Sequence, residues 1–199
     1  MKYNPGVHHR RSIRLKGYDY SCAGAYLVTI CTRGRECLFG EMVNEDVVLN
    51  GMGRMVKTWY LKLPNKFPDI KCDEHVVMPN HIHAIIQNVG TDQGELVGAD
   101  PRVCPDNEQG ERTGSPLPRV IQWFKTMTTN AYIRGVRQNQ HLSFPIKLWQ
   151  RDYYEHIVRN ENALNRIRGY IRNNPLQWEL DRENPNGRKH AKKKNRELG

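Results

Sequence analysis

The strongest constraint on the fold is an apolar run at residues 76–86, which reads VVMPNHIHAII. Its β-branched residues favour an extended chain, and the Pro-Asn pair interrupts that chain as a short break. His81 and His83 are two positions apart, so in a strand both side chains point to the same face of a sheet. Two neutral imidazoles on one strand are two ligands of a metal site that is already oriented.

The spacing of apolar residues elsewhere predicts the other elements. Asn160 is a plausible helix N-cap, and Pro175 stops that helix after Asn174. One strand, a helix and two adjacent strands predict an α+β fold, in which helices pack on one face of a small, mainly antiparallel sheet. Besides the strand with the two histidines, strands are predicted at residues 25–31, 70–78 and 146–157, and helices at residues 47–62, 119–134 and 160–173.

The chain has 199 residues, a length that suits one domain. We expect that domain to span residues 1–180. Residues 90–116 are rich in Gly, Asp, Glu, Pro and Thr without apolar periodicity, and predict a flexible insertion. Residues 181–199 are rich in Asn, Lys and Arg and predict a basic, disordered tail.

The charge of the chain points to a polyanionic partner, because the formal net charge is +10 and the isoelectric point is near 9.5. No apolar run approaches the roughly 20 residues of a membrane span, and no apolar segment of a secretory signal follows the N-terminus. The 5 cysteines are scattered without a CxxC pair. An odd, scattered set argues against a disulfide framework and for a reducing cytoplasm.

A second pair of residues extends the metal hypothesis. Tyr170 and Asn174 are four positions apart, so both lie on one face of the last predicted helix. If this helix packs on the sheet, it presents a phenol and an amide oxygen to His81 and His83. Two imidazoles and one amide oxygen leave open positions for a substrate, as a catalytic metal needs. A nearby dication would lower the pKa of the phenol, ordinarily near 10, and make Tyr170 a nucleophile.

Four segments in order resemble the REP-associated tyrosine transposases, a branch of the single-tyrosine HUH transposases. They are RLKGYDY near the start, VVMPNHIHAII, LWQRDYYEHIVRN and GYIRNNP, and they extend over residues 14–178. The resemblance implies that His81, His83 and Asn174 bind Mg²⁺ or Mn²⁺ and that Tyr170 attacks the scissile phosphate of single-stranded DNA. It also implies an RRM-like (ferredoxin-like) HUH fold.

The implied activity is that of an endonuclease and strand transferase in DNA transposition. The product is a 5′-phosphotyrosyl DNA with a free 3′-hydroxyl, and attack by such a hydroxyl on the adduct rejoins the strand. The implied substrate is a REP element, a palindromic hairpin with a short flanking tetranucleotide. Relatives of this kind include both monomers and homodimers, so either assembly is open.

Several alternatives remain open from the residues. The two histidines could be buried or interface residues, each satisfied by a backbone group, and Asn174 could be only a helix cap. A structural zinc site could combine the histidine pair with Cys72 and His75. Tyr153 and Tyr154 are rival nucleophiles. The rival function is a nucleic-acid-binding module of the same fold without cleavage activity.

The expected DNA contacts are basic side chains along the chain, with Trp123, Trp149, Tyr153 and Tyr154 as candidates for stacking on unpaired bases. Arg166 and Arg168 are further basic residues of the last helix that share the Tyr170 face only in part. The predicted nucleic-acid-binding residues are Arg10, Arg11, Arg14, Lys16, Arg119, Lys125, Arg151, Arg159 and Arg172.

Overall fold

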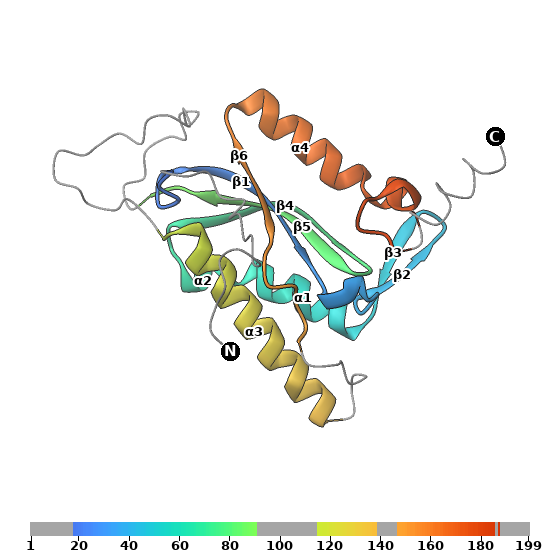
Figure 1. Cartoon of the computed structure of the whole chain (residues 1–199). Coiled ribbons are helices and arrows are strands. Elements are labelled where there is room, and N and C mark those ends of the chain that lie inside the picture. The colour runs from blue at the N-terminus through green and yellow to red at the C-terminus, as the bar shows by residue number, and fades with distance from the viewer. Residues whose placement is uncertain (1–17, 91–114, 139–146, 186, 188–199) are drawn as a thin grey trace, which may run out of the picture.

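The fold is a four-stranded antiparallel sheet with helices on both faces, seen in a computed structural model that describes residues 18–90, 115–138, 147–185 and 187 (Figure 1). The strand order is β4-β5-β1-β6. The strands are β1 (Gly24–Cys31), β4 (Ile70–Met78), β5 (His81–Asn88) and β6 (Tyr154–Val158). The predicted α+β class with a mainly antiparallel sheet is therefore confirmed.

The helices lie on two sides of this sheet. α1 (Gly51–Leu61), the short α2 (Leu63–Lys66) and α3 (Leu117–Arg137) lie on one side, and α4 (Glu161–Asn173) lies on the other (Figure 1). The prediction that helices cover only one face is wrong. The physical reason is that every residue of β1 and β5 is buried, so both faces of these central strands need a cover.

The residues of β1 alternate between two apolar clusters. Tyr26, Val28 and Ile30 belong to the large core under α1 and α3, whereas Leu27 packs in a smaller cluster with Leu164 and Ile171 of α4 and their neighbours. Antiparallel pairing places His81 opposite Cys31 and His83 opposite Thr29. Because alternate side chains of a strand lie on the same face, both histidines face α4, as Leu27 does.

The segment before α1 differs from its prediction. A helix was expected over residues 47–62, but residues 46–49 form β3 (Asp46–Leu49), paired with β2 (Gly40–Val43). α1 begins only after Asn50, whose side chain accepts hydrogen bonds from the backbone N–H groups of Met52 and Gly53 at 2.8 and 3.0 Å. A Cβ at Gly53 would collide with the Phe39 carbonyl oxygen, so this helix start requires glycine.

The expected strand over residues 146–157 is also shorter, because only Tyr154–Val158 pairs as β6. Residues 147–153 form an irregular segment, joined to the sheet by one isolated bridge between Thr32 and Trp149. Lys125 of α3 holds this segment, because its Nζ donates to the carbonyl oxygens of Gln150, Arg151 and Asp152 at 3.0, 3.2 and 3.2 Å. Side-chain hydrogen bonds replace the missing strand ladder here.

α4 starts and ends as predicted and is tied to the sheet by an ion pair. The Asn160 side chain accepts a hydrogen bond from Ala163 N at 2.8 Å, and Pro175 begins the 3₁₀ turn η2 (Pro175–Leu180). Arg168 donates from Nε and Nη2 to the two oxygens of Asp73, at 3.0 and 2.6 Å. Asp73 stands at an irregularity of β4 between Cys72 and His75, so the bulge supplies the anchor for α4.

Several sequence predictions fall outside the described residues, namely the insertion apart from its edges, most of the basic tail, and Arg10, Arg11, Arg14 and Lys16. The fold nevertheless continues past residue 180, where the tail was expected to begin. Glu183 Oε2 lies 2.8 Å from Arg35 Nε, and Asn184 is buried.

The cysteines and the helices bear on two further expectations. Cys31, Cys37 and Cys72 are free thiols, but Cys22 is disulfide-bonded, which the scattered spacing did not predict. Within the described ranges, every helix is too short or too polar to cross a membrane.

Candidate metal site and nucleophile

The two histidines form the centre of the candidate site. Their ring centroids are 4.5 Å apart, and both side chains are buried. Thr29 Oγ1 lies 2.7 Å from His83 Nδ1, and Asn80 Oδ1 lies 2.8 Å from His81 Nδ1. The Nδ1 atoms are thus engaged, and the Nε2 atoms are the ones available to a ligand.

The partners of Asn80 identify the tautomer of His81. Asn80 Nδ2 donates to the carbonyl oxygens of Arg35 and Glu183, at 3.1 and 2.8 Å. Because these bonds identify the amide nitrogen, Asn80 Oδ1 must be an acceptor, and His81 Nδ1 must carry the proton. His81 Nε2 therefore presents a lone pair, the form that binds a metal.

Burial keeps both imidazoles neutral. It lowers the pKa of His83 to about 4, and it lowers the pKa of His81 well below the usual value, helped by the charges of His83 and Arg35. At neutral pH, protons do not compete with a metal ion for these nitrogens.

Three buried acceptor or lone-pair atoms meet here without a hydrogen-bond partner in the described part of the chain: His81 Nε2, Asn174 Oδ1 and Asp181 Oδ2. The candidate ligand atoms of His81, His83 and Asp181 lie within 4.8 Å of one another, and His81 Nε2 is 3.6 Å from Asp181 Oδ2. Unpartnered buried polar atoms are costly, and a divalent cation would satisfy all of them together. The residues present therefore fit a metal ion.

Asp181 is the residue that sequence reasoning missed, because it was assigned to the basic tail. It follows η2, and Trp178 within η2 stacks on His81 with ring centroids 6.1 Å apart. Burial raises the pKa of the Asp181 carboxyl, with a further rise from the charge of Glu183. A single Asp outside any periodic pattern carries no local signal that distinguishes it from other surface acids.

Tyr170 reaches the same centre from α4. Its hydroxyl lies 3.3 Å from His83 Nε2, and its side chain is 43% exposed. Burial and the negative charge of Asp181 raise the pKa of Tyr170, whereas the Asn174 amide opposes this rise. The phenol thus stays protonated unless a positive charge enters the site.

His83, Tyr170, Asn174 and Asp181 line a cavity of about 780 Å³, and the two rival tyrosines line it as well. Tyr154 is more than half exposed, and the ring centroid of Tyr153 lies 5.4 Å from Lys125 Nζ. The structure therefore brings Tyr170 to His83, with Tyr153 and Tyr154 at the cavity wall.

The alternative zinc set does not assemble. Cys72 Sγ lies 3.1 Å from the Tyr60 carbonyl oxygen, and the His75 ring packs against the Tyr60 ring with centroids 4.7 Å apart. Cys72 packs against the core on the α1 side, whereas His81 and His83 face α4. A zinc site built from Cys72, His75, His81 and His83 is therefore wrong.

The structure divides the predicted DNA contacts into free and engaged side chains. Arg119, Arg151 and Arg159 are exposed. Arg172 is exposed and lies 3.1 Å from Glu74. Lys125 is turned inward onto three carbonyl groups, and burial lowers its pKa to about 8 against the opposing negative charge of Asp152.

The two tryptophans do not present free faces to DNA. Trp123 packs with Trp59 and Phe67. Trp149 is buried and donates from Nε1 to Thr128 Oγ1 at 2.8 Å. Both complete the core under α3, which is the alternative role that a tryptophan at such a position has most often.

Comparison with known proteins gives two informative matches. No established family profile matches the chain. A protein of Haemophilus influenzae (strain Rd KW20), itself described as uncharacterized, is 40% identical over 181 residues, which are 90% of this chain and 96% of the relative. The solved structure of a REP-associated tyrosine transposase bound to a REP hairpin has a TM-score of 0.54 at 18% identity, over 84% of this chain and 74% of that chain.

A presumed transposase from Deinococcus radiodurans has a TM-score of 0.43 at 15% identity, over 81% of this chain and 97% of that chain. At such identities, the match to the first solved structure establishes a shared fold.

Proposed function

The chain belongs to one family with the Haemophilus influenzae protein and has the fold of a REP-associated tyrosine transposase, and from this premise we propose that it cleaves and rejoins single-stranded DNA through Tyr170. The observation that carries the proposal is the convergence of a phenol with the unpartnered atoms of His81, Asn174 and Asp181. A structural cluster would satisfy these atoms internally, whereas a catalytic metal site leaves them for the ion and its substrate.

The residues that would hold the metal are His81, His83, Asn174 and Asp181. A set of two imidazoles, one amide oxygen and one carboxylate suits Mn²⁺, and it also accommodates Mg²⁺ because half of its ligands are oxygens. When bound, the ion supplies positive charge that stabilises a phosphate undergoing attack and lowers the pKa of a nearby phenol.

Two side chains of the protein then have separate roles, because Tyr170 is the nucleophile and Arg168 positions its helix. Tyr170 Oη releases its proton to solvent and forms a bond to the phosphorus, and the bond from phosphorus to the 3′ oxygen breaks. This gives a 5′-phosphotyrosine and, once the 3′ oxygen takes a proton from solvent, a free 3′-hydroxyl. The reverse attack by a 3′-hydroxyl of another strand restores the phenol and joins the strands. Arg168 holds α4 against β4 through Asp73, so that Tyr170 is oriented before the substrate arrives.

The proposed substrate is a single-stranded hairpin of the REP type, supported by the hairpin bound to the protein of the same fold and by the net charge of +10. Tyr170 and His83 of one chain lie in contact, so the proposed site needs no second copy. This favours a monomer acting in cis over a homodimer that exchanges α4.

A denaturing gel tests the function. The protein is incubated with a labelled single-stranded hairpin repeat taken from beside its own gene, with Mn²⁺ or with EDTA. We expect a covalent adduct and a cleaved strand with Mn²⁺ alone. Tyr170→Phe should abolish both products, while the control Tyr154→Phe should retain them.

Each other outcome is decisive. An adduct that persists in Tyr170→Phe would transfer the nucleophile to Tyr153 or Tyr154. Tight binding without cleavage would favour the rival reading, a binding module of this fold.

The carboxylate ligand has its own test, independent of cleavage. Titration calorimetry with Mn²⁺ should show an affinity that is about 10- to 100-fold weaker in Asp181→Asn than in the unmodified protein. Glu179→Gln is the matched control, because Glu179 is an exposed acid two residues away. Equal affinities in all three proteins would exclude Asp181 as a ligand.

A further inference from the structure

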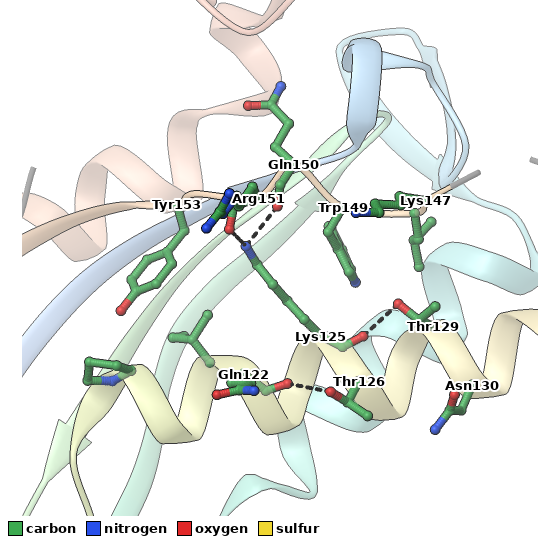
Figure 2. A pocket seen from close by; sticks show the side chains of 13 residues that line it. Gln122, Lys125, Thr126, Thr129, Asn130, Lys147, Trp149, Gln150, Arg151 and Tyr153 are labelled. Atoms are coloured by element: carbon green, nitrogen blue, oxygen red, sulfur yellow. Dashed lines mark hydrogen bonds between the residues drawn. The ribbon is translucent and has the colours of Figure 1, made fainter. Parts of the chain in front are cut away.

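A second cavity, of about 760 Å³, lies between α3 and the irregular segment of residues 147–153 (Figure 2). One wall is the polar face of α3, where Gln122, Thr126 and Asn130 are exposed. The other wall carries Lys147 and Arg151, which are also exposed. Both walls therefore carry side chains that can form hydrogen bonds with a ligand.

The charge of this groove differs from that of the candidate metal site. Its described lining contains the three cations Lys125, Lys147 and Arg151 and no Asp or Glu. The metal-site cavity, in contrast, includes the carboxylates of Asp152, Asp181 and Glu183. The groove is therefore suited to an anionic ligand that does not itself need a metal.

The two cavities share a wall. Gln150 and Tyr153 line both of them, so the two cavities adjoin at this segment. This wall lies at the β6 edge of the sheet, just before Tyr154, where the pairing of β6 with β1 begins. The groove therefore lies next to the metal-site cavity, on the other side of this edge.

The shared wall is held in place by hydrogen bonds. Gln150 N donates to the Cys31 carbonyl at 2.9 Å, and Arg33 N donates to the Leu148 carbonyl at 2.8 Å. Lys125 crosses beneath the wall to the carbonyl groups of residues 150–152 (Figure 2). The shared wall is therefore held in place before any ligand binds, so binding against it costs little reorganisation.

We propose that this groove binds the single-stranded nucleotides that flank the scissile phosphate, an inference that rests on the proposed function. Lys147 and Arg151 contact backbone phosphates, and the amides of Gln122 and Asn130 reach the edges of unpaired bases. Lys125 is the positioning residue, because its ammonium group holds the wall.

Fluorescence anisotropy separates the groove from the catalytic site. All proteins carry Tyr170→Phe, and the buffer contains EDTA, so that no strand is cleaved and binding is measured alone. The probes are a REP-type hairpin without flanks, the same hairpin with a 5′ flank and the same hairpin with a 3′ flank. The groove variants are K147E with R151E, and separately T126E, which adds a carboxylate without removing a cation.

We expect one flank to strengthen binding by about 10-fold or more when the groove is unaltered. Both groove variants should remove that gain in affinity. The double variant should also lower the salt slope for the flanked probe by about 1.4, as expected when two phosphate contacts to a single strand are lost. Affinity for the hairpin without flanks should stay unchanged. K66E with K71E is the matched control, because both lysines are exposed and line neither cavity.

Two results would overturn the proposal. One is that neither flank strengthens binding when the groove is unaltered. The other is that the groove variants weaken the hairpin without flanks as much as the flanked probes, or weaken no probe. Because no cleavage is measured, a failure of the groove remains distinct from a failure of the proposed strand transfer.

Discussion

The two faces of β1 and β5 are buried to a similar degree but differ in what they bury. Toward α1 and α3, alternate residues such as Val28 and Ile82 join one large apolar core. Toward α4, the intervening positions include Thr29, His81 and His83. One pair of strands therefore stabilises the fold with one face and forms a reactive site with the other.

The difference lies in how polar atoms are satisfied. On the α4 face, His81 Nε2 is a buried atom without a hydrogen-bond partner among the residues that the structure describes, and the same holds for Asp181 Oδ2 beside it. Each such atom costs about 1–3 kcal/mol. A fold can carry this cost when the opposite face supplies the packing energy, so we expect mutations on the two faces to have separable effects.

The largest expected effect is on chemistry, from His81→Gln on the α4 face. Cleavage with Mn²⁺ should fall by about 1000-fold, because a ligand of the charge that stabilises the phosphate is lost. Without metal, the free energy of unfolding should fall by only about 1–2 kcal/mol, because the hydrogen bond from Nδ1 to Asn80 Oδ1 is lost while Nε2 has no partner among the described residues. Gel assays and urea unfolding in EDTA measure the two quantities.

The next effect is on stability, from Ile82→Ala, which lies between the two histidines but faces the core. The free energy of unfolding should fall by about 3 kcal/mol, because a nearly inaccessible side chain leaves a cavity. The affinity for Mn²⁺ should stay within about twofold. A large loss of metal affinity at unchanged stability would contradict the separation of the two faces.

The third effect is on the pH dependence of the metal-free protein. Burial lowers the folded pKa of His83 to about 4, below the unfolded value near 6.5, so the unfolded state binds more protons between these values. Stability is therefore complete above about pH 6.5 and is lost as the pH falls through 4, by about 3 kcal/mol for this residue. Urea unfolding in EDTA, repeated at several pH values in this range, measures the quantity. The free energy of unfolding should depend less steeply on pH in His83→Gln than in the unmodified protein.

The smallest effect concerns the ion pair between Arg168 of α4 and Asp73 of β4. Arg168→Gln removes the two hydrogen bonds to Asp73, whose pKa these bonds hold below the usual value against the opposing effect of burial. We expect a loss of about 1 kcal/mol in stability and a fall of roughly tenfold in kcat/KM, because Tyr170 is less firmly oriented. Arg166→Gln is the control for stability, since Arg166 is an exposed residue of the same helix. Equal unfolding energies in the two variants would contradict the proposed tie.

The sequence determined the features that depend on local geometry. The alternation of a strand placed His81 and His83 on one face, and the Asn160 cap and Pro175 located the ends of α4. The spacing of four residues in a helix placed Tyr170 and Asn174 on one face of α4, and Tyr170 lies in contact with His83. These inferences need only the direction of side chains relative to their own backbone.

Tertiary structure alone decided which distant segments meet. Asp181 joins the histidines, Lys125 turns inward to hold a loop, and α4 covers the second face of the sheet. None of these has a periodic pattern of its own, because each depends on a contact between segments far apart in the chain. Local propensity sets where a side chain points, whereas the packing of the whole chain sets what it meets there.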